Sequence, residues 1–292
     1  MDIVLALAAA LLFGVGTVLQ QRAAMQVPDE EAMKAGLLVR LAKEPVWLAG
    51  IVADALGFVL QAVALAVGRI VVVQPLLATA VVFALPFGAR LDRRRLTRNE
   101  ILGAAAVVGG VASFVVVSNP TGGVDDPELS VWIVSGAICV AASGALALVA
   151  KGRSPGVKAS LLGSAAGILF ALSAVLTKAV ADQFDDGILD IFVHWQLYAL
   201  VAVGWVGMTL SSAALQTGAL APAAATQMSL DPVVSVALGV FAFDESLHET
   251  FVGGAVALAG FAVMIVGLVV LSGSQSSRET NAVVPTKAPM PA

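Results

Sequence analysis

Two carboxylates lie within long apolar runs of the chain, where a charged side chain is costly. Asp54 lies within VWLAGIVADALGFVLQAV (46–63), and Asp231 within LAPAAATQMSLDPVVSVAL (220–238). An aspartate at the centre of a membrane-spanning helix costs about 2.5–3.5 kcal/mol, so it should face protein or water rather than lipid. We therefore predict that both acids line a polar path, where each could bind a proton, a cation or the cationic part of a solute.

Further polar residues follow these acids at helical spacing. Gln61 comes two turns after Asp54, and Gln227, Asp231 and Ser235 follow one another at intervals of four residues. Residues four apart lie on the same face of a helix. Each acid thus belongs to a polar stripe, and we add Gln61, Gln227 and Ser235 to the predicted path.

A proline directly follows the second acid. Pro232 has no N–H to donate to the carbonyl of Met228, so a broken, oxygen-rich helix is expected there. Hard cations such as Mg²⁺ prefer oxygen ligands, which makes Asp54 and Asp231 the candidate metal ligands. The alternative is a simple proline kink in which Asp231 makes a local hydrogen bond.

Four other polar residues near the ends of apolar runs are candidates for the path: Gln20, Gln21, Gln74 and Lys178. Gln74 could instead form a hydrogen bond between helices. Lys178 could extend its ammonium group to the membrane interface, pair with an acid or bind an anionic solute.

The composition determines the class of protein. Of 292 residues, 59% are hydrophobic and 12% are charged, against about 45–50% and 25% in soluble domains. One cysteine and two histidines argue against a disulfide framework or a Cys/His metal centre. Phosphate-loop, dinucleotide and zinc-protease motifs are absent. We expect an all-α polytopic membrane protein that is not an enzyme and has no cofactor. Its partners would be the lipid bilayer and a small solute or cation, with no nucleic acid and with a homodimer as one option.

Nine apolar runs are long enough to span a bilayer. Their approximate limits are Ile3–Ala24, Val46–Val67, Ile70–Ala89, Ile101–Ser118, Ser130–Ala150, Leu161–Ala181, Ile191–Ala214, Leu220–Phe243 and Phe251–Leu271. With this count, one side of the membrane holds fourteen of the 16 Lys and Arg residues, and the other side holds only Arg69. Because basic loops stay in the cytoplasm, we predict a plasma-membrane protein with its N-terminus outside and its C-terminus cytoplasmic.

Acids gather on the predicted outer side. They either keep short loops soluble or form a vestibule that concentrates cations. They are Asp2, Asp125, Asp126, Glu128, Asp182, Asp185, Asp186, Asp190, Asp244, Glu245 and Glu249.

The first four spans resemble the last four. LLFGVGTVLQQRA (11–23) matches ILFALSAVLTKAV (168–180), and a constant offset of 150 residues then matches Gly57 with Gly207, Gly68 with Gly218 and Gly110 with Gly260. Five spans separate the starts of the two units, so the second enters the membrane from the opposite side, as in many secondary transporters. We predict two inverted four-helix repeats, at 1–118 and 161–272, a linker helix within 119–160 and a disordered cytoplasmic tail at 273–292.

Two longer segments carry a resemblance to a known superfamily. QAVALAVGRIVVVQPL (61–76) with EILGAAAVVGGVASFVVVSNP (100–120), and the stretch 213–267, are similar to the EamA-like drug/metabolite transporters. LFGVGTVLQQRAA (12–24) and the span count resemble the NIPA-type magnesium transporters. The resemblance implies a central cavity and alternating access.

Three functions follow as alternatives. The first is a secondary transporter of a small solute, and the second is a magnesium or divalent-cation transporter. The third is a lipid-handling or assembly protein without a soluble substrate, which would show a lateral opening between helices toward the bilayer.

Overall fold

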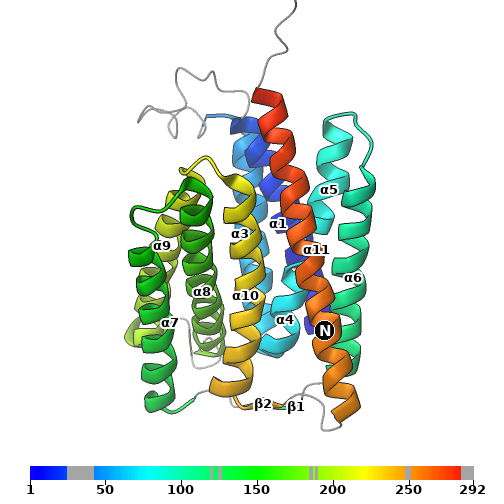
Figure 1. Cartoon of the computed structure of the whole chain (residues 1–292). Coiled ribbons are helices and arrows are strands. Elements are labelled where there is room, and N and C mark those ends of the chain that lie inside the picture. Colours follow the sequence, from blue (N-terminus) through cyan, green and yellow to red (C-terminus); the bar gives the residue numbers. More distant parts are fainter. Residues whose placement is uncertain are drawn as a thin grey trace, which may run out of the picture.

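The computed structural model describes residues 1–24, 43–118, 121–123, 127–183, 187, 190–246 and 251–283. Within these ranges the chain forms an upright bundle of helices (Figure 1). The elements are α1 (Asp2–Ala24), α3 (Pro45–Val67), α4 (Ile70–Leu77), α5 (Ala80–Leu91), α6 (Arg98–Ser118), β1 (Thr121–Gly122), α7 (Leu129–Val149), α8 (Pro155–Asp182), the 3-10 helix η2 (Asp190–Val193), α9 (Trp195–Leu215), α10 (Leu220–Ala242), β2 (Glu245–Ser246) and α11 (Phe251–Val283).

The predicted fold class is confirmed. In the described part of the chain, nine helical segments are long and apolar enough to cross a membrane, with α4 and α5 together forming the third. The two-residue strands β1 and β2 pair antiparallel, Thr121 with Ser246 and Gly122 with Glu245. They join the segment that follows α6 to the segment that follows α10 at one end of the bundle, which we call the β end (Figure 1).

The structure breaks the third span, whereas the sequence predicts a break at Pro232 in the eighth. α10 continues through Pro232, because membrane helices tolerate proline where neighbouring groups satisfy the freed backbone. The third span instead stops at Leu77 and resumes at Ala80, and the Thr79 hydroxyl donates to the Leu76 carbonyl over 2.6 Å. Such a side-chain bond to a nearby backbone carbonyl competes with the helical pattern.

Contacts within the two halves match as an inverted repeat predicts. α1 packs on α3, and α8 packs on α9. A Cβ atom added to Gly57 would lie 3.0 Å from the Phe13 ring, and one added to Gly207 would lie 3.2 Å from the Phe170 ring. The start of α1 and the end of α8 both lie beside Gly68 at the β end, so the two halves run in opposite directions.

The halves also meet where α6 crosses α11. A Cβ atom added to Gly110 would lie 2.5 Å from the Gly260 carbonyl oxygen, and these two glycines are repeat equivalents. We expect Gly110→Ala to destabilise the fold by about 1–3 kcal/mol, because the two backbones cannot separate without losing their packing. Gly109→Ala is the matched control, since nothing lies within 4 Å of its added Cβ. Equal thermal unfolding of the two variants in detergent would contradict this close crossing.

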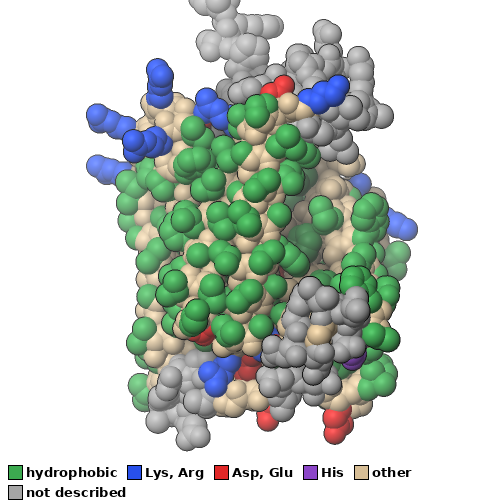
Figure 2. Space-filling model, turned by 180° about the vertical axis from the view of Figure 1, so that it is seen from behind, with side chains coloured by type: hydrophobic (Ala, Val, Ile, Leu, Met, Phe, Trp, Pro, Cys, Tyr) green, Lys and Arg blue, Asp and Glu red, His purple; other side chains and the backbone are tan. Residues whose placement is uncertain are grey.

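The two ends of the bundle differ in their content of basic side chains. Figure 2 shows Lys and Arg side chains gathered at the end away from β1 and β2, which we call the basic end. α11 reaches this end and continues as a helix to Val283, so residues 273–283 of the predicted disordered tail are helical. Residues 284–292 of that tail lie outside the described residues.

Candidate functional site

Three polar residues from three helices meet at the centre of the bundle. Gln61 of α3, Gln74 of α4 and Asp231 of α10 line two neighbouring cavities, of about 220 and 510 Å³. Among the described residues that line either cavity, Asp231 alone is charged. The structure therefore brings together three of the predicted path residues around a single negative charge.

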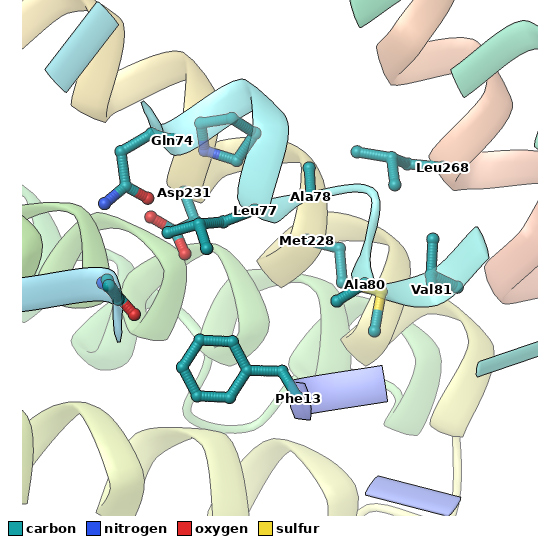
Figure 3. Close-up of a pocket in the computed structure, with 11 residues that line it drawn as sticks. Phe13, Gln74, Leu77, Ala78, Ala80, Val81, Met228, Asp231 and Leu268 are labelled. Carbon is teal, nitrogen blue, oxygen red and sulfur yellow. The ribbon is translucent and has the colours of Figure 1, made fainter. Parts of the chain in front are cut away.

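Asp231 is positioned by its own helix. α10 starts after a turn at Gly218, whose φ of +78° suits glycine, and Asp231 lies near the middle of the helix. The Ser235 hydroxyl, one turn further on and fully buried, donates to Asp231 Oδ1 over 3.3 Å. The predicted stripe thus places Ser235 as a support for the carboxylate, which turns toward the smaller cavity (Figure 3).

Gln74 lies beside Asp231 in the lining of the smaller cavity (Figure 3). Its side chain is only 5% exposed, and its amide nitrogen is buried without a hydrogen-bond partner. Figure 3 shows the Gln74 amide oxygen on the side of Asp231. Carboxylate and amide oxygens are both ligands that hard cations such as Mg²⁺ and Ca²⁺ accept. Gln74 and Asp231 can therefore supply oxygen ligands to a cation.

The broken third span forms one wall of the smaller cavity. Leu77 and Ala78, at the end of α4, and Ala80, at the start of α5, all line it (Figure 3). Irregular backbone at membrane depth is tolerated where it lines a cavity, and broken helices of this kind mark binding sites in transporters. The break thus follows Gln74-Pro75 in the third span and does not occur at Pro232, where the sequence predicts it.

The larger cavity has a side that faces the lipid. It extends between α3, α8 and α9, and its lining residues Phe58, Val201 and Trp205 are 47%, 64% and 75% exposed. On helices that cross a bilayer, exposed apolar side chains face acyl chains. Figure 2 looks onto this face, where the surface is hollowed between two groups of helices. We call this cavity the lateral cleft.

Asp54 lies apart from the central site. Its carboxylate accepts a hydrogen bond from Gln20 Nε2 at the contact between α1 and α3, and it is not among the residues that line the two cavities. Glycines on both helices, Gly16 and Gly50, make room for this pair. The structure therefore joins Asp54 to Gln20 and does not bring it to Asp231.

The remaining predicted path residues lie away from the central cavities, toward the two ends of the bundle. Gln227 accepts a hydrogen bond of 2.7 Å from Ser211 between α9 and α10, and Gln21 is exposed near the basic end of α1. Lys178 is 5% exposed and lies at the β end. Its ammonium group donates to the carbonyls of Leu65 and Gly68, over 3.0 and 3.4 Å, and does not extend to solvent.

Lys178 forms an ion pair of 3.7 Å with Asp182 of its own helix. A second buried charged residue of the β end, Glu245, is one of the acids that the sequence places on the outer side. Glu245 is 2% exposed, and its carboxylate accepts hydrogen bonds of 2.9 Å from the N–H groups of both Ile70 and Val71. Lys178 thus binds the last carbonyls of α3, and Glu245 binds the first amides of α4, as the helix dipoles favour. Both residues belong to the second half, and both hold the turn at Gly68 in the first half. We call Lys178 and Glu245 the turn clamp.

The charge state of Glu245 reflects its burial. Burial raises the pKa of the Glu245 carboxyl. Hydrogen bonds from Val71 and Ile70 lower that pKa, as do the positive charges of Lys178 and Arg69. Burial is the largest of these influences, so the pKa of Glu245 lies above its ordinary value, and the basic residues of the β end oppose that rise.

Nine candidate spans among the described residues, with a carboxylate beside a broken helix, are features of multi-pass membrane transporters. The chain matches the family model of the magnesium transporter NIPA over residues 1–277, and it belongs to that family. It is also 31% identical over 274 residues to an uncharacterised protein of Corynebacterium glutamicum, covering 92% of this chain and 94% of that protein. No solved structure matches the chain significantly.

Proposed function

We propose that this protein transports Mg²⁺, or a divalent cation of similar size, across the plasma membrane through the central site. The observation that carries the proposal is the single carboxylate of Asp231, faced by the amide of Gln74 and neighboured by that of Gln61. The family supports magnesium as the substrate.

The donor set fits a cation that keeps its water. Mg²⁺ loses water reluctantly and is often bound through one or two carboxylates together with several waters. Within the described ranges no group of three or more His, Cys, Asp or Glu side chains could form a dehydrated metal cage. A cavity needs roughly 10–15 Å³ per water, so the smaller cavity of about 220 Å³ accommodates an ion with its hydration shell.

The charged ends support one orientation. Because basic loops remain in the cytoplasm, the basic end would face the cytoplasm and the β end the outside. The N-terminus, at the start of α1, would then be outside, and α11 would end in the cytoplasm.

Ion uptake by the purified protein tests the proposal. In liposomes loaded with a Mg²⁺-sensitive dye, we expect saturable Mg²⁺ entry down its gradient, which protein-free liposomes lack. Well-folded protein that carries no Mg²⁺, Mn²⁺ or Co²⁺ in this assay would exclude divalent-cation transport.

A further inference from the structure

The lateral cleft has a lining that an inorganic ion does not require. Three aromatic side chains, those of Phe58, Phe170 and Trp205, line it together with aliphatic groups, and the carboxylate of Asp231 lies among them. Its volume of about 510 Å³ is within the range of roughly 300–1,000 Å³ that is typical of small-molecule sites. Mg²⁺ with its water shell gains little from such apolar walls.

Trp205 occupies an unusual depth. It is the middle residue of α9 (Trp195–Leu215) and is 75% exposed. Tryptophans of membrane proteins are enriched at the interfaces, as at Trp195, because the indole N–H favours the polar headgroup region. An exposed tryptophan at mid-membrane depth on the wall of a cleft is better explained by a ligand than by anchoring.

A polar pair fills the space between α1 and α3 in the first half. The equivalent space between α8 and α9 in the second half lacks such a pair, which leaves the cleft open. The offset of 150 residues places Gly204 at the position equivalent to Asp54, and the match of 11–23 with 168–180 places Thr177 at the position equivalent to Gln20. Asp54 and Gln20 join α1 to α3, whereas Gly204 and Thr177 both line the cleft. A Cβ atom added to Gly204 would have the Ser173 hydroxyl as its nearest neighbour, 4.0 Å away.

We propose that the lateral cleft is a binding site for an amphipathic organic cation, an amine or a quaternary ammonium compound. The compound enters from the bilayer and places its positive group near Asp231 and its apolar groups against the aromatic walls. Rings of Trp and Phe attract cations through their faces, most strongly when water is excluded. Because Asp231 also belongs to the ion site, bound compound competes with the transported cation.

Charge complementarity selects this class of ligand. Of the described residues that line the cleft, Asp231 is the only charged one, so the site offers a negative group and no Lys or Arg. A phospholipid headgroup would bring a phosphate without a cationic partner, and a neutral lipid would leave the carboxylate unpaired. A compound whose single charge is positive pairs with the carboxylate and brings no unpaired anion into the cleft.

Equilibrium dialysis of radiolabelled tetrapropylammonium against the full-length protein in phosphatidylcholine nanodiscs tests this proposal. We expect saturable binding to the unaltered protein and at least a tenfold weaker affinity for Gly204→Leu, whose new side chain fills the cleft. Gly109→Leu is the matched control, because Gly109 also faces open space but lies on α6, away from the cleft. The milder Gly204→Ala should reduce affinity less than Gly204→Leu.

The outcomes separate this site from the proposed Mg²⁺ transport. Undiminished affinity in a well-folded Gly204→Leu variant would overturn the location of the site, and undiminished affinity in Asp231→Asn would overturn the role of the carboxylate. Binding to the unaltered protein in the absence of any divalent-cation flux would support the cleft while refuting the proposed transport.

Discussion

Replacing Asp231 with asparagine is expected to reduce Mg²⁺ uptake into liposomes to the background of protein-free vesicles. The substitution keeps the shape of the side chain and an oxygen for the Ser235 hydroxyl, but it removes the one charge among the described residues that line the cavities. At 4 Å and an effective dielectric constant of 20, a unit charge contributes about 4 kcal/mol per unit of cation charge. For the doubly charged Mg²⁺ this is about 8 kcal/mol, so cation occupancy should fall by a factor on the order of 10⁶.

Asp54→Asn is the matched comparison for this experiment. It also removes a carboxylate from the membrane interior, but from the α1–α3 contact with Gln20 and not from the central cavities. Since an asparagine oxygen can still accept the Gln20 hydrogen bond, we expect uptake to change only a few-fold. If both variants lose uptake equally, Asp54 belongs on the path as its sequence context predicts, and the distinction drawn from the cavities is wrong.

The span count was predictable because bilayer thickness sets the length of an apolar run. The alternation of Lys and Arg provides an independent check on the count. Asp231 and Ser235 were also predictable as partners, because a four-residue interval fixes their common face. Such inferences use only local geometry and hydropathy.

The meeting of Gln61 and Gln74 with Asp231 could not be derived in the same way. The three residues lie on different helices, and their spacing in the sequence does not show how those helices pack. The cost of burying a charge also could not distinguish Asp54 from Asp231. A polar cavity can offset that cost, and so can a single hydrogen-bond partner on a neighbouring helix. Gln20 is such a partner for Asp54.

Glu245 illustrates a different limit of sequence reasoning. An acid in a short loop after a membrane span normally faces water, and the sequence around Glu245 contains nothing that indicates burial. Its burial depends on the pairing of β2 with β1 and on the free amides at the start of α4. Only the three-dimensional arrangement of the two halves shows that these amides lie within reach.

Disruption of the turn clamp is expected to open the β end. Glu245→Ala leaves the amides of Ile70 and Val71 without their acceptor, and Lys178→Met leaves the carbonyls of Leu65 and Gly68 without their donor. A hydrogen bond to a charged group contributes about 1.5–3 kcal/mol. Each substitution should therefore shift the equilibrium between closed and open β ends about tenfold or more toward the open state.

A thiol placed behind the clamp reports this shift. Ala174 on α8 is 4% exposed and lines the lateral cleft, and Cys139 is the chain's own cysteine. In a Cys139→Ser, Ala174→Cys background, a charged, membrane-impermeant thiol reagent added from the β end should label Cys at 174 about tenfold faster when either clamp residue is replaced. Unlike an amphipathic cation, this membrane-impermeant reagent does not partition into lipid, so faster labelling must reflect an aqueous route into the lateral cleft.

Glu128→Gln provides the control for lost charge. Glu128 is an exposed acid at the same end of the bundle, where it accepts a hydrogen bond from Ser130 and does not contact the turn at Gly68. If this variant labels as fast as Glu245→Ala, the effect comes from a weaker negative potential at the β end and not from the clamp. Labelling that is slow in Glu128→Gln and fast in both clamp variants would identify Lys178 and Glu245 as the contacts that hold the β end closed. An inverted-repeat transporter opens when one repeat moves against the other. Contacts that join the two charged residues of the second half to the turn of the first half would therefore have to break on opening.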